Sequence, residues 1–113
     1  MEAATSIAHA QMPQHMQALA EANRVRLARA ALKRAVLGGD LDTAEVVREC
    51  PWEVETMTVG ELLRSQRRWG RTRTRKFLDS MQLSENRELG RLTLRQRSLL
   101  ASELDAKQGI IHS

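Results

Sequence analysis

The chain has 113 residues, enough for one small domain, and its 18 lysines and arginines outnumber its 14 acidic residues. Only 3% of the residues are aromatic, so the core must come mainly from leucine, valine, alanine and methionine. The single cysteine, Cys50, excludes an intramolecular disulfide, and the three histidines lack the spacing of metal ligands. No apolar run reaches the roughly 18 residues that a membrane span needs. We therefore expect a cytoplasmic protein that uses no metal, no cofactor and no membrane.

Alanine, leucine, arginine and glutamate dominate the composition, and these residues favour helices. The composition therefore predicts an all-α fold. We expect a flexible N-terminal arm at residues 1–13, an all-α domain at 14–106 and a tail at 107–113. Within the domain we expect five helices, with one long helix followed by a compact four-helix unit.

The first helix is predicted over residues 14–37. Its expected buried stripe follows i, i+4 spacing and consists of Leu27, Ala28, Ala31, Leu32, Ala35 and Val36. A different face carries Arg26, Arg29 and Lys33, which are either exposed surface charge or a secondary binding surface. The two glycines at 38 and 39 are expected to end this helix, because glycine readily adopts the left-handed conformation found at helix C-termini.

Three short polar patterns mark the starts of later helices, because each pairs a capping residue with Glu or Gln three positions on. Asp42 and Glu45 predict a helix over 43–49, which Pro51 would end. Trp52 follows in an expected loop at 52–56 and is expected to pack on the core. Thr58 and Glu61 predict a helix to about residue 66.

The third pattern is Thr93 with Gln96, which predicts a last helix over 93–106. Leu99, Leu100 and Leu104 are its expected core residues. Before it, a helix is predicted over 71–82, and its apolar stripe consists of Thr74, Phe77, Leu78 and Met81. Residues 83–92 would connect these two helices.

Positive charge is concentrated between the two middle helices. Residues 57–76 contain seven basic side chains and one acid, Glu61, a local charge of +6 against +4 for the whole chain. A turn at Trp69 and Gly70 precedes the second of these helices. The first backbone N–H groups of that second helix would be unpaired and would lie at the positive end of the helix dipole. Such a turn is suited to binding the phosphates of a nucleic acid.

The stretch MTVGELLRSQRRWGRTRTRKFLDSMQL, followed by SENRELGRLTLRQRSLL, resembles the actinobacterial integration host factor family. The resemblance extends without gaps over about residues 57–104. It implies a helix–two-turn–helix module at about 57–83 and a nucleoid-associated protein, of an actinobacterium or its phage, that binds double-stranded DNA with little sequence preference. It further implies DNA bending or condensation and assistance to site-specific recombination, with an integrase or a topoisomerase as a partner. We expect a monomer.

The resemblance assigns phosphate contacts to Gly70, Arg71 and Arg73 at the turn and to Arg87 in the connector. Glu88 and Gly90 stand where the family usually has basic residues, which leaves Arg91 as the candidate substitute. The full set of candidate DNA-binding residues is Arg67, Arg68, Trp69, Gly70, Arg71, Arg73, Arg75, Lys76, Arg87 and Arg91, with Arg26, Arg29 and Lys33 as a secondary set. Trp69 could stack on DNA or wedge between bases, but we favour a role in packing the turn onto the core.

Two other binding functions use the same type of module: RNA or ribosome binding, and sequence-specific transcriptional regulation. A ribosomal protein would be expected to have a more basic tail than AKQGIIHS, and a regulator would be expected to show an array of base-reading side chains. Catalysis is not expected, because no acid/histidine pair or zinc-ligand cysteine set is present.

Overall fold

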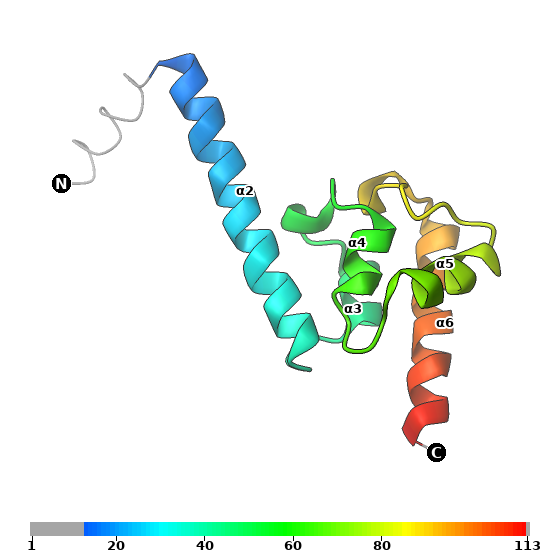
Figure 1. Ribbon diagram of the computed structural model, residues 1–113. Helices are drawn as coiled ribbons and strands as arrows, with labels where there is room; N and C mark the ends of the chain where they lie inside the picture. The colour runs from blue at the N-terminus through cyan, green and yellow to red at the C-terminus, as the bar shows by residue number, and fades with distance from the viewer. Residues whose placement is uncertain (1–12, 113) are drawn as a thin grey trace.

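The computed structural model describes the backbone of residues 13–112 and the side chains of residues 13–107. This part of the chain is all-α, as predicted, with five α-helices and two short 3₁₀-helices (Figure 1). The helices are α2 (Gln14–Leu37), α3 (Thr43–Glu49), η1 (Trp52–Val54), α4 (Val59–Arg64), α5 (Arg71–Asp79), η2 (Leu89–Arg91) and α6 (Leu94–His112). None of them is long and apolar enough to cross a membrane. Apart from Pro13, the arm expected at residues 1–13 lies outside the described residues.

The long helix α2 has the bounds that the sequence predicts, but its buried stripe is shorter. Leu32 and Val36 are buried, whereas Leu27 is 61% exposed, so its expected burial was wrong. The reason is that α2 packs on the domain mainly through its C-terminal half, where Arg29 and Lys33 reach residues near η1 and in α4, while the N-terminal half contributes the contact of Arg24 with the Trp52 ring. The N-terminal half extends past the compact part of the fold (Figure 1).

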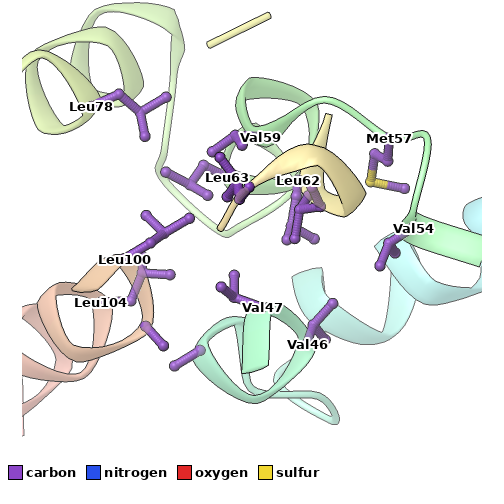
Figure 2. Close-up of a cluster of buried hydrophobic side chains, with 14 of the residues drawn as sticks. Val46, Val47, Val54, Met57, Val59, Leu62, Leu63, Leu78, Leu100 and Leu104 are labelled. Carbon is purple, nitrogen blue, oxygen red and sulfur yellow. The ribbon is translucent and has the colours of Figure 1, made fainter. Parts of the chain in front are cut away.

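The core lies between α3, α4, α5 and α6. Leu62 and Leu63 of α4 are fully buried, as predicted, and α3 packs along α6. Figure 2 shows Leu63, Leu78 and Leu100 directed into one cluster. The expected burial of Leu99 was wrong, because it lies one residue from the buried Leu100 on the helix and is 45% exposed.

Of the three predicted capping boxes, the one at Thr93 and Gln96 is confirmed in full, and the one at Thr58 is confirmed only for the Thr58 side chain, because the Glu61 carboxylate pairs with Lys33. Thr93 and Gln96 form a reciprocal pair, with N···O distances of 2.9 and 3.1 Å, and Thr58 accepts a hydrogen bond from the Glu61 backbone. The Asp42–Glu45 capping box is absent although α3 begins where expected. The Glu45 carboxylate accepts instead from Arg48, which also pairs with Asp105 of α6.

Several boundaries differ from prediction. The helix α4 ends at Arg64 rather than near residue 66, and α5 ends at Asp79 rather than Gln82, whose φ of 57° is incompatible with a continuing helix. The last helix continues to His112, past the expected end at residue 106. Trp52 begins a 3₁₀-helix and is 45% exposed, so its predicted place in the core was wrong. Its ring instead lies 4.1 Å from the Arg24 guanidinium.

The connector between α5 and α6 is held against the start of α4 by backbone hydrogen bonds. The amides of Val59 and Gly60 donate to the carbonyls of Arg87 and Glu85 at 2.8 and 2.9 Å. Further along, the amides of Leu89 and Gly90 donate to the carbonyls of Met57 and Glu55 at 3.0 and 2.9 Å. The two segments therefore run antiparallel, and this arrangement fixes the connector relative to α4.

We expect Gly60→Ala to destabilise the fold, because a Cβ at this position would lie 2.9 Å from the carbonyl oxygen of Glu85. The expected loss is about 1–3 kcal/mol in the free energy of unfolding, measured by urea denaturation. Gly70→Ala is the matched control, since its Cβ would meet nothing within 4 Å. Equal stability of the two variants would contradict the close packing at Gly60.

Candidate nucleic-acid interface

Two successive turns join α4 to α5. In the first, the amides of Ser65 and Gln66 donate to the carbonyls of Leu62 and Leu63, and in the second the Trp69 amide donates to the carbonyl of Gln66 at 3.2 Å. The left-handed conformation in this segment falls on Arg68, with φ of 68°, and Gly70 is extended. Gly70 therefore does not need to be glycine for its backbone angles. The open space around it instead leaves the backbone accessible to a ligand.

Trp69 packs the turn onto the core, the role that we favoured from the sequence. It is 9% exposed, and its ring makes an edge-to-face contact with Phe77 at 5.1 Å between centroids. The Arg73 guanidinium lies over the ring, 4.4 Å from its centroid. The indole therefore also restricts the position of a basic side chain at the start of α5.

The N-terminus of α5 faces solvent without a side-chain cap. The Thr74 amide donates to the Gly70 carbonyl, so the preceding amides of Arg71, Thr72 and Arg73 lie at the helix end where intrahelical acceptors are missing. No acidic residue lies in this first turn. The start of α4 is different, because connector carbonyls and Thr58 accept from its first amides.

The basic side chains of α5 lie on two sides of the helix. Arg73 and Lys76 line a hollow between α5 and α6. On the other side Arg75 lines a hollow with the connector and lies 3.5 Å from the carboxylate of Glu85. All four basic residues of α5 are exposed, as are Arg67 and Arg68 in the turn. The helix thus presents positive charge on both sides of its open end.

The connector residues Arg87 and Arg91 are exposed and border one hollow with Glu88. Arg87 donates to the Arg91 carbonyl at 3.3 Å, and the Arg91 side chain lies 3.1 Å from the Glu88 carboxylate. Because this ion pair partly neutralises the charge of Arg91, the charge of Arg87 is the more available of the two for a phosphate. The contact of Arg75 with Glu85 places this connector beside α5.

The three basic residues of α2 have different environments. Arg29 donates to the Glu53 carbonyl at 3.0 Å and to the Thr56 hydroxyl, and Lys33 forms an ion pair with Glu61 at 2.9 Å. These two side chains hold α2 on the domain. This role was missed from the sequence, because their acceptors lie more than 20 residues away. Arg26 remains exposed and donates to Asn23.

Charge pairs outside this region lie at the surface. The hydrogen bond that Arg24 donates to Glu21 lowers the pKa of the Glu21 carboxyl, and the hydrogen bonds that Arg48 donates to Asp105 and Glu45 raise the pKa of Arg48. In the described residues, no group of three or more histidine, cysteine, aspartate or glutamate side chains could hold a metal ion. The candidate interface therefore depends on backbone amides and basic side chains.

The fold is similar to that of a solved structure described as sIHF bound to an 8-bp palindromic DNA. The TM-score is 0.68 at 24% sequence identity, over 74% of this chain and 97% of the other. No family model matches the sequence, and a search of curated proteins finds no match. The two chains share a fold, and in the solved one that fold is bound to DNA.

Proposed function

We propose that the chain is a nucleoid-associated protein of the integration host factor kind that binds double-stranded DNA through its phosphates. The proposal rests chiefly on one observation: six exposed basic residues between positions 67 and 76, with no acid among them, surround the uncapped start of α5. Helix-end amides and basic side chains bind phosphate oxygens directly. The similarity to a DNA-bound solved structure supports the same ligand.

The composition of α5 favours binding with little sequence preference. Its exposed residues are arginine, threonine, lysine and aspartate, and the helix lacks the asparagine and glutamine that read adenine. Arginine and lysine can read guanine, but here they surround the helix start, and we assign them to phosphates. Phosphate contacts fix position on a duplex without reading its sequence. We therefore propose that the helix–two-turn–helix module binds the DNA backbone and does not read an operator sequence.

Beyond binding, we propose that the protein bends or compacts DNA and assists a recombinase in the nucleoid. Arginines on both sides of α5, together with Arg87, would engage phosphates around one groove and favour a deformed duplex. A ligase-catalysed circularisation assay on a duplex of about 150 bp, near the persistence length, tests this. We expect more circles with protein, and an unchanged yield would contradict bending.

Fluorescence anisotropy with three unrelated 20-bp DNA duplexes and one RNA duplex tests the choice of partner. We expect micromolar binding, in the range of about 10⁻⁴–10⁻⁶ M for nonspecific contacts, with less than tenfold spread among the DNAs. A preference of about 10³ for one DNA would indicate a specific regulator. Tighter binding to RNA would favour the ribosomal alternative.

A further inference from the structure

A second positively charged surface lies beside the candidate interface, in a groove between α5 and α6. We call it the α5–α6 groove. Its polar lining consists of Thr72, Arg73, Lys76, Ser80, Glu103 and Lys107. Trp69 and Phe77 lie beneath it as buried residues. The lining thus contains three basic side chains and one acidic side chain. Arg73 and Lys76 come from α5, and Lys107 comes from α6.

The cations of this groove are available for an external anion. Arg73 is held over the Trp69 ring at 4.4 Å, an arrangement that leaves its N–H groups unused by any acid. Among the described side chains, no salt bridge joins Arg73, Lys76 or Lys107 to an acid. All three are exposed. The groove therefore keeps its net positive charge.

The groove is continuous with the turn. A neighbouring hollow shares Trp69, Arg73 and Lys107 with it and also reaches Arg67 in the turn. Lys76 follows Arg71 by five residues, about 7.5 Å along the helix axis. Successive phosphates of one strand advance about 3.4 Å along the duplex axis. Where the duplex axis runs along α5, a strand with one phosphate at the start of the helix would bring a later phosphate level with Lys76.

We propose that the α5–α6 groove is a second contact surface for the phosphodiester backbone of the same duplex, with Lys107 of α6 as its outer cation. This inference rests on the proposed DNA binding and extends the footprint from the turn to the last helix. Arg73 joins the two surfaces, since it belongs to the first turn of α5 and also lines the groove. The single acid in the lining, Glu103, lowers the affinity of this surface for phosphate.

The test uses the full chain and a 20-bp duplex of random sequence at several salt concentrations. For Lys107→Ala, which leaves the six basic residues of the proposed interface intact, we expect the slope of log K against log salt to become shallower by about 1. For Lys76→Ala/Lys107→Ala we expect a change of about 2, with affinity roughly tenfold lower or more at 0.1 M salt. For Glu103→Gln we expect the opposite change, a rise in affinity of about two- to threefold. Thermal unfolding by circular dichroism should match wild type, since all three side chains are exposed.

Arg24→Ala/Arg34→Ala is the control for the double lysine variant, because it removes the same charge from α2 and neither residue lines the groove. If Lys107→Ala and Glu103→Gln both keep the wild-type slope and affinity, the groove does not contact DNA, and the proposed function still stands. If the wild-type protein fails to bind the duplex, that result contradicts the proposed DNA binding itself, whatever the groove does. Lysine substitutions that spare DNA binding but abolish binding of a polyglutamate peptide would overturn the assignment in favour of an acidic protein partner.

Discussion

Arg71→Ala/Arg73→Ala is expected to lose about 100-fold in DNA affinity at 0.1 M salt. The two guanidinium groups lie in the first turn of α5, beside its free amides, where no acid competes with a phosphate. A hydrogen bond to a charged group contributes about 1.5–3 kcal/mol, so two of them account for about 3 kcal/mol, or two orders of magnitude. The salt dependence should weaken in parallel, by about 2 in the log–log slope. Anisotropy titration of a random 20-bp duplex measures both.

The control for this variant is Arg24→Ala/Arg34→Ala, which makes the same change in net charge. We expect it to retain at least a third of the wild-type affinity, because screening at 0.1 M salt limits charge effects to about 10 Å. Circular dichroism must show that the test variant is folded, since Arg73→Ala also removes the contact with Trp69. A folded Arg71→Ala/Arg73→Ala protein with wild-type affinity would show that the start of α5 is not the binding site.

Leu63→Ala is expected to have the largest effect on stability. The side chain is fully buried in the last turn of α4 and meets the cluster that includes Leu78 and Leu100 (Figure 2). Leucine-to-alanine changes in such cores cost about 2.7–5 kcal/mol, through lost burial and a residual cavity. In a domain of this size that loss lowers Tm by roughly 15–30 °C. Urea denaturation provides the free energy directly.

Leu94→Ala makes the same chemical change at a side chain that is 75% exposed. We expect it to change the free energy of unfolding by less than about 0.5 kcal/mol. Leu63 immediately precedes the two turns, so DNA binding by Leu63→Ala should fall with its folded fraction and return on cooling to the temperature of maximum stability. Similar losses in the two variants would contradict the placement of Leu63 in the core.

Local patterns in the sequence predicted much of the fold. The bounds of α2, the reciprocal cap at Thr93 and the buried stripe Thr74, Phe77 and Leu78 each depend on residues within one helix or its ends. Periodicity alone could not show how far the rest of the domain extends along α2. For that reason Leu27 was wrongly placed in the core.

In the candidate site, too, features set by consecutive residues could be predicted and contacts between distant segments could not. The charge of the turn and the start of α5 could be recognised from the sequence, because those residues are consecutive. The groove with Lys107 could not, since α5 and α6 meet there only after folding. The attachment of α2 through Lys33 and Glu61 likewise joins residues 28 positions apart. Sequence-local chemistry was therefore predictable, and contacts between distant segments were not.

The central claim is that the protein binds duplex DNA by neutralising phosphates, and a salt titration of wild-type protein on random-sequence duplex tests it most directly. If about four to six phosphates are neutralised, the slope of log K against log salt should be about −4 to −5. That result, with weaker binding to duplex RNA, is the one that the structure predicts. A slope near zero, or tighter binding to RNA, would contradict the claim.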